Sequence, residues 1–170
     1  MSGMTGWMVR SAVALLLWHG NTVFAQQNGP AVGQTSPNLI GRTLAEDKLY
    51  RLSSDKSGPK VINFFWVECH PCKTEMPELA RFEKAYPKVK FLFVHARDEK
   101  REVVDKFVKS LPAAPSTIIL ASGAVQETFQ IMGLPHTVVM DRNNVVVANL
   151  VGYTPENMKN LKKMLEELSR

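Results

Sequence analysis

The period of the apolar positions changes several times along the chain, and each change marks a predicted element. Residues 60–66 form a compact apolar run rich in branched and aromatic side chains, which is typical of a buried strand. Residues 71–86 instead place an apolar side chain every three or four positions, which predicts a helix. Between residues 39 and 52 a weak alternation surrounds two acidic residues, so we expect a hairpin at the edge of the domain.

The second half of the chain continues this alternation of strands and helices. A turn signal at residues 141–144 separates two apolar runs, so residues 137–140 and 145–151 are expected to form a hairpin. Thr154 and Pro155 are suited to cap a final helix that extends to about Leu168. The other predicted elements are a strand at 89–95, a helix at 98–111, a strand at 117–120 and one short helix within 123–132. This order predicts an α/β fold, with a mixed central sheet flanked by helices.

The first 25 residues differ from the rest of the chain. Arg10 precedes an apolar stretch from Ser11 to Trp18, and Ala25 supplies a small residue at which a leader is cut, so residues 1–25 are predicted to be a signal peptide. The apolar stretch is shorter than the ~18 to 20 residues that cross a bilayer comfortably, which favours cleavage near Ala25. An uncleaved segment that anchors the chain to a membrane is the alternative.

Composition predicts one folded domain and argues against nucleic acid as a partner. The chain has 170 residues, of which 45% are hydrophobic, enough to bury one core; we expect it over 38–170, after a polar, turn-rich flexible leader at 26–37. The net charge is +5, but basic and acidic residues are interleaved, so neither DNA nor RNA binding is expected. We expect a monomer in the periplasm or another extracytoplasmic compartment, where disulfides form and persist.

The two cysteines, Cys69 and Cys72, are separated by only two residues, so a disulfide between them would close almost no loop and stabilise little. Its role is expected to be chemical. Both follow a predicted buried strand at the start of a helix, where free amide groups and the helix dipole favour a thiolate, and Pro71 suits the first helical turn. We expect Cys69, at the exposed corner, to attack, and Cys72, one turn into the helix, to resolve the mixed disulfide.

Three neighbours of the dithiol each have two interpretations. A charged His70 would favour the thiolate and make the disulfide more oxidising, or it faces solvent with little influence. Glu75 lies on the same helical side as Cys72 and is placed to accept its proton, or it only complements the helix dipole. Trp66 is either core filler or a platform beside the sulfurs.

These residues form a pattern that resembles the TlpA/ResA-like thiol-disulfide oxidoreductases of the thioredoxin superfamily. The pattern is a strand ending in residues 63–66, the pair Cys69 and Cys72, then Glu75 and Pro77, and Gly133-Leu134-Pro135 some sixty residues later. The resemblance covers about residues 36 to 168. It implies a thioredoxin fold with an N-terminal hairpin and a βα insertion.

The resemblance also implies roles for individual residues. The first cysteine attacks, the second resolves, the family's buried glutamate maps onto Glu75, and a cis-proline loop at Leu134-Pro135 lines the groove that binds substrate. Two positions depart from the family. His70-Pro71 is an unusual pair between the cysteines, and His136 replaces the threonine that commonly follows the cis-proline. We therefore take Trp66, His70, Pro71, Leu134, Pro135 and His136 as candidate substrate-binding residues.

The direction of electron flow and one rival function stay open. The resemblance implies a reductase of partner disulfides, for example in cytochrome c maturation, with client proteins that carry cysteines and a membrane protein as electron donor; His70 argues for an oxidase or isomerase instead. The rival is a copper-binding or delivery protein that uses the two cysteines with His95 or His136, although a two-residue spacer suits redox exchange better. Lys73 replaces the histidine of a c-type haem site, and no metal or cofactor is expected.

Overall fold

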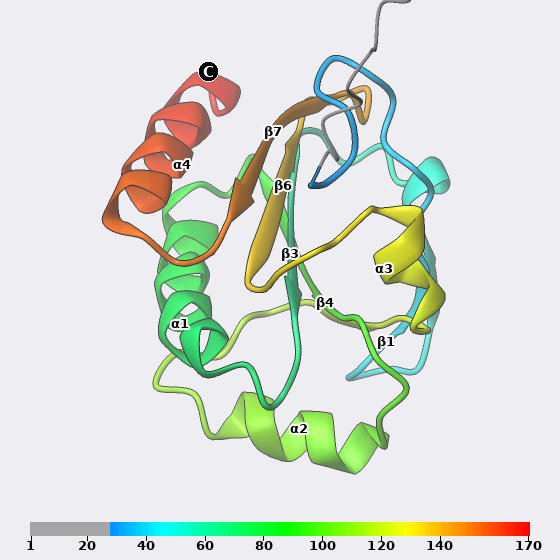
Figure 1. The fold of residues 1–170 in the computed structure, drawn as a ribbon. Coiled ribbons are helices and arrows are strands. Elements are labelled where there is room, and N and C mark those ends of the chain that lie inside the picture. Colours follow the sequence, from blue (N-terminus) through cyan, green and yellow to red (C-terminus); the bar gives the residue numbers. More distant parts are fainter. Residues whose placement is uncertain (1–27) are drawn as a thin grey trace, which may run out of the picture.

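The computed structural model describes residues 28–170, and within them a mixed sheet of seven strands lies between helices on its two faces (Figure 1). The strand order is β2-β1-β5-β4-β3-β6-β7. The strands are β1 (Ile40–Thr43), β2 (Leu49–Arg51), β3 (Lys60–Phe65), β4 (Lys90–His95), β5 (Ile118–Leu120), β6 (His136–Met140) and β7 (Val146–Val151). The helices are α1 (His70–Ala85), α2 (Arg101–Lys109), α3 (Ala124–Thr128) and α4 (Pro155–Leu168), with a 3-10 turn η1 (Leu52–Ser54).

Strand β3 is the centre of the sheet and leads directly to the two cysteines. All six of its residues are buried, as the unbroken apolar run predicts for a strand that is covered on both faces. It pairs in parallel with β4 and antiparallel with β6. The register with β6 sets Asn63 opposite Thr137, although the two residues are 74 positions apart in the sequence.

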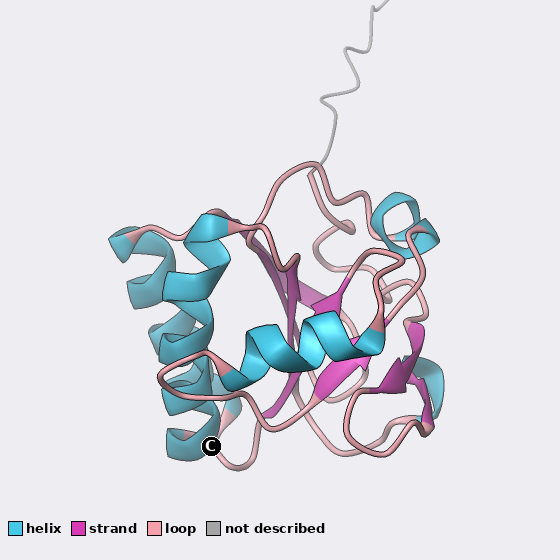
Figure 2. Cartoon of the chain, turned by 90° about the horizontal axis from the view of Figure 1, so that it is seen from below, coloured by secondary structure: helices cyan, strands magenta, loops and turns pink. Residues whose placement is uncertain are grey.

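Alternate residues of β3 enter two separate cores. The ring of Phe65 stacks on Phe107 of α2, with 5.6 Å between the centroids, in the core that α1 and α4 also cover. The ring of Phe64 packs against Phe129, just after α3, at 5.1 Å in the core on the opposite face. The view in Figure 2 shows the strands enclosed between these helices.

Both predicted hairpins are confirmed, and one predicted helix is shorter than expected. β1 pairs with β2 and β6 pairs with β7, each antiparallel. The helix expected from residue 98 begins at Arg101, because Lys100 is extended and forms its N-cap. The short helix expected within 123–132 is present as α3, which ends at Thr128 before Gln130 takes a positive φ of 53°.

The structure corrects the expectation of a flexible leader over residues 28–37. This segment lies along β7 and the loop before β6, and its backbone makes hydrogen bonds to both. The Gly33 amide donates to the Val146 carbonyl at 2.8 Å, and the Val146 amide donates to the Gln34 carbonyl at 2.9 Å. We call residues 28–37 the strap. Its polar, turn-rich composition suits an irregular segment, but composition does not reveal that its hydrogen-bond partners lie far away in the sequence.

The predicted signal peptide at 1–25 and the first two residues of the predicted leader lie outside the described residues. Among residues 28–170, no helix is long and apolar enough to cross a membrane.

Candidate active site

The two cysteines form a disulfide at the start of α1. Cys69 is the N-cap of the helix, Pro71 lies in its first turn, and the Cα atoms of Cys69 and Cys72 are 5.3 Å apart. The backbone N–H of Cys72 points to the Sγ of Cys69 at 3.3 Å. A negative charge on this sulfur would therefore meet a free backbone donor and the positive end of the helix dipole, the two features that favour a thiolate.

The two sulfurs differ in accessibility. Cys72 is fully buried, whereas Cys69 is half-buried and His70 and Pro71 are exposed beside it. A partner protein can therefore reach Cys69 but not Cys72. This is the arrangement expected for an attacking thiol with a shielded resolving thiol.

Glu75 lies one helical turn beyond Cys72 and is buried, with 3% of its surface exposed. Burial disfavours the carboxylate and raises the pKa of Glu75 to about 7; a hydrogen bond from Asn63 opposes this, and the charge of Glu78 adds to it. A carboxyl group with this pKa can both accept and return a proton near neutral pH. Its burial and raised pKa favour the acid-base interpretation over dipole compensation.

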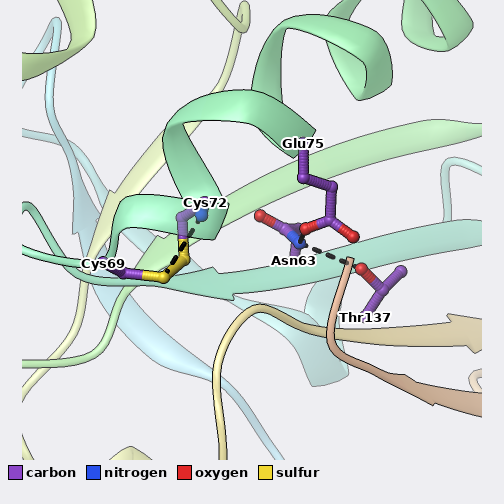
Figure 3. The surroundings of a disulfide bond; sticks show 5 residues. All are labelled: Asn63, Cys69, Cys72, Glu75 and Thr137. Atoms are coloured by element: carbon purple, nitrogen blue, oxygen red, sulfur yellow. Dashed lines mark hydrogen bonds between the residues drawn. A yellow bond between two sulfur atoms is a disulfide. The ribbon is translucent and has the colours of Figure 1, made fainter. Parts of the chain in front are cut away.

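Asn63 connects Glu75 to the sheet. Its side-chain Nδ2 donates to Oε2 of Glu75 at 2.8 Å and to Oγ1 of Thr137 at 2.9 Å (Figure 3). The amide thus holds the carboxyl group from β3, below the helix that carries the dithiol. Sequence alone places Asn63 in the family pattern but assigns it no contact, because the pairing of β3 with β6 brings Thr137 to it.

A groove of about 550 Å³ opens beside Cys69. Trp66 forms one wall, where the guanidinium of Arg97 lies 3.7 Å from the centre of its ring. Leu134 lines the groove, and the Leu134-Pro135 bond is cis. The remaining lining residues are Glu68, Pro71, Gln126, Ile131, Met132 and Gly133. Half-buried Trp66 therefore lines the groove and also packs against the core on one face of the sheet.

The structure separates His136 from the other candidate substrate-binding residues. His136 is fully buried, and its ring packs at right angles to that of Phe64, on the sheet face opposite Asn63 and Glu75. Its Nε2 lies 3.4 Å from Oδ1 of Asn149, under the strap of residues 28–37. Successive residues of a strand point to opposite faces, so His136 does not follow Thr137 toward the site, and the structure gives no support to the expectation that it contacts substrate.

Several residues of the groove have no role predicted from the sequence, among them Arg97, Gln126 and Met132. Arg97 follows β4, Gln126 lies in α3 and Met132 lies in the loop after α3, with 62% of its surface exposed. The only sequence feature that could have pointed to these residues is the apolar Met132 just before the Gly-Leu-Pro turn, and this signal is weak. The folding of α3 against β4 decides that these residues meet Cys69.

The described residues offer no cluster of three or more His, Cys, Asp or Glu side chains that could hold a metal. His95, one candidate ligand of the rival function, is buried and packs against Phe65. Its Nδ1 lies 3.2 Å from the Arg97 carbonyl, and burial lowers the pKa of its ring. The other candidate, His136, faces away from the sulfurs.

Comparison with known proteins decides the family. The family model described as thioredoxin-like matches residues 58–146, more than half of the chain. The chain belongs to this thioredoxin-like family. This match spans the central strand, the dithiol helix and the cis-proline turn, and confirms the predicted thioredoxin fold.

This thioredoxin-like chain is similar to curated thiol-disulfide oxidoreductases over nearly its full length. Sporulation thiol-disulfide oxidoreductase A of Bacillus subtilis is 25% identical over 160 residues, which cover 91% of this chain and 92% of the relative. Thiol-disulfide oxidoreductase ResA of Bacillus cereus is 27% identical over 164 residues, with 94% and 88% covered. Together with the disulfide, these similarities identify a thiol-disulfide oxidoreductase of the thioredoxin superfamily and confirm the resemblance found in the sequence.

Solved structures support the same fold. A thiol:disulfide interchange protein described as DsbE, from Chlorobium tepidum, superposes with a TM-score of 0.73 at 19% identity, covering 82% of this chain and 99% of the other. StoA of Bacillus subtilis gives a TM-score of 0.59 at 24% identity, with 79% and 98% covered. At these identities the likeness concerns the fold alone.

Proposed function

We propose that this chain is an extracytoplasmic protein-disulfide reductase that transfers electrons from Cys69 and Cys72 to disulfides of client proteins. The observation that carries the proposal is the combination of one reachable sulfur, one buried sulfur and a buried carboxyl group with a pKa of about 7 one turn away. Each is what one step of dithiol exchange requires.

The reaction starts from the dithiol form. The Cys69 thiolate, favoured by the helix N-terminus, attacks a client disulfide; the client S–S bond breaks, one client thiolate leaves, and a mixed disulfide forms at Cys69. Cys72 then gives its proton to the carboxylate of Glu75 and attacks the Sγ of Cys69. The second client thiolate leaves, and the Cys69-Cys72 disulfide that the structure contains is restored. Two electrons have passed to the client.

The groove beside Cys69 supports the binding of an extended client segment. Its walls offer the Trp66 ring, the guanidinium of Arg97 and the apolar side chains of Met132 and Leu134. We assign the client contacts to Trp66, Leu134 and the exposed His70 and Pro71, with Pro135 shaping the turn from a buried position.

We infer the cellular setting from the sequence. A leader or anchor at residues 1–25 supports export. The resemblance supports a membrane protein that returns electrons to the dithiol. We infer that the reductase is a monomer and that cytochrome c maturation is one process that would use it.

The equilibrium reduction potential of the Cys69-Cys72 couple tests the direction. It is measured in glutathione or dithiothreitol buffers and read from thiol alkylation or the fluorescence of nearby Trp66. We expect a value below about −220 mV, which suits a dedicated reductase. A value near about −120 to −150 mV would overturn the reductase and favour an oxidase or isomerase.

A His70→Ala variant provides the matched comparison. If the exposed His70 makes the couple more oxidising, the variant has a lower potential than the natural chain. If its charge has no influence, the two potentials agree within error, and the helix N-terminus alone sets the stability of the Cys69 thiolate.

A further inference from the structure

The amide of Asn63 has one end satisfied and one end unsatisfied. Its Nδ2 uses both hydrogens, one for Glu75 and one for Thr137. Its Oδ1 is buried and has no hydrogen-bond partner in the disulfide form. An unpartnered buried carbonyl oxygen destabilises the fold, so its persistence calls for a reason.

The unsatisfied oxygen lies on the side of the dithiol. The two donor contacts fix the amide plane, and Oδ1 then points away from Thr137 and toward the side where Cys72 lies (Figure 3). Cys72 is fully buried and belongs to the core that α1 builds on this face of the sheet. The oxygen therefore points to the side of a residue that solvent does not reach.

The redox state decides whether this sulfur can be a donor. In the disulfide, Cys72 carries no hydrogen and offers nothing to Oδ1. Reduction breaks the S–S bond and leaves a protonated thiol on the buried Cys72, and S–H is a donor that needs an acceptor. Reduction thus gives Cys72 the hydrogen-bond donor that Oδ1 of Asn63 lacks in the disulfide form.

We propose that Asn63 is a positioning residue for the resolving thiol: in the dithiol form the S–H of Cys72 donates to Oδ1 of Asn63. One amide then holds the Cys72 thiol at its oxygen and the Glu75 carboxyl at its nitrogen, the donor and acceptor of the proton that moves in the resolving step. This inference rests on the proposed roles of Cys72 and Glu75, and adds the residue that aligns them.

Infrared spectroscopy of the S–H stretch tests the hydrogen bond directly. The chain has two cysteines, so a Cys69→Ala variant keeps Cys72 as its only thiol. In the folded variant we expect the S–H band to be shifted to lower wavenumber than in the same chain unfolded in denaturant, because hydrogen bonding weakens the S–H bond. Adding Asn63→Leu, whose side chain branches in the same way and has no oxygen, is expected to abolish most of this shift.

The matched control is Thr137→Val in the Cys69→Ala background. It removes one contact of the Asn63 amide and leaves Oδ1 in place, so the band shift is expected to remain. An unshifted band in folded Cys69→Ala overturns the proposal even if the Asn63→Leu chain fails to fold, and so does a shift that survives Asn63→Leu in a folded chain. No client is used, so a failure of the reductase function and a failure of this contact are distinguishable.

Discussion

At the scale of single residues, the chemistry of this protein depends on the contrast between neighbours. Cys69 is accessible and Cys72 is not, although one helical turn separates them. Glu75 continues the same helical side into the core, where burial shifts its pKa into the range in which a thiol can exchange protons with it. A buried carboxyl group of this kind has consequences for both rate and stability.

Replacing Glu75 by Gln is expected to slow the resolving step by about a hundredfold, because positioned general bases contribute roughly 10²- to 10⁴-fold. In the natural chain the rate should rise as the pH passes about 7, where Glu75 becomes a carboxylate able to accept the Cys72 proton. The Glu75→Gln variant should lose this rise. The measurement is stopped-flow release of a thiol from a mixed disulfide preformed at Cys69, at a series of pH values.

The control for this prediction is Glu78→Gln, which removes a carboxylate from the next turn of α1. Glu78 accepts a hydrogen bond from Tyr153 at 3.0 Å, and its charge raises the pKa of Glu75. The variant should keep the pH-dependent rise with its midpoint moved to lower pH. Equal rates and profiles for Glu75→Gln and the natural chain would contradict the role of Glu75.

The raised pKa of Glu75 also predicts how stability depends on pH. The unfolded chain releases the Glu75 proton near pH 4.5 and the folded chain near pH 7, so the folded state holds more protons in this window and loses stability as the pH rises through it. The loss amounts to roughly 3 kcal/mol. Glu75→Gln removes it, so the variant should gain stability relative to the natural chain between pH 5 and pH 8.

Urea unfolding of both disulfide-bonded chains at pH 5 and pH 8 provides the measurement. A stability difference between variant and natural chain that is the same at both pH values would show that Glu75 titrates alike in the folded and unfolded states.

At the scale of elements, the strap of residues 28–37 shows how an irregular segment becomes part of a fold. Gly29 lies against the side chains of Asn149 and His136, where a β-carbon has no room, and its φ is +99°. The Nδ2 of Asn149 donates to the Pro30 carbonyl at 2.7 Å, which fixes the strap beside β7. The strap thus covers buried His136, the residue that follows the cis-proline.

A comparison of two glycines tests this packing. Gly29→Ala should destabilise the chain more than Gly33→Ala, because both positions have positive φ but only Gly29 is crowded. We expect about 1 kcal/mol for Gly33→Ala from backbone strain and roughly 1 to 3 kcal/mol more for Gly29→Ala from overpacking. Urea unfolding of the two variants measures the difference, and equal losses would mean that the strap does not hold its place in solution.

At the scale of the whole molecule, the dithiol lies where the central strand ends and a helix begins, between two cores built on opposite faces of the sheet. The wall of the groove opposite Trp66 comes from α3, which follows the inserted β5, and from the cis-proline turn, which contribute Gln126 and Leu134. The redox state of this one site is therefore linked to the stability of the entire fold.

For a reductase, the disulfide-bonded chain should be more stable than the dithiol chain. The short Cys69-Cys72 loop contributes little by itself, but a low reduction potential means that the folded chain favours its disulfide form, and the disulfide then adds to the stability of the fold. Strongly oxidising dithiol proteins show the reverse order, because their reduced form is stabilised. Urea unfolding with and without a reductant decides between them, and a dithiol chain that is at least as stable as the disulfide chain would contradict the proposed direction.

Much of this architecture could be predicted from local pattern. The buried run at 60–66, the helical spacing after Pro71 and the turn at 141–144 each depend on residues close in sequence, and each predicted element is present. The ends of the helices at 98–111 and 123–132 were less predictable, because competing backbone conformations at Lys100 and Gln130 decide where a helix stops.

The sequence by itself determined the dithiol, its place at a helix N-terminus and the helical side shared by Cys72 and Glu75, because these follow from spacing along one strand and one helix. Only the tertiary structure decided the burial of Glu75, its hydrogen bond with Asn63 and the opposite orientation of His136. The physical reason is that burial and pairing are properties of contacts between β3, β6 and α1. Such contacts join residues far apart in the chain, and no local pattern of apolar and polar positions encodes them one by one.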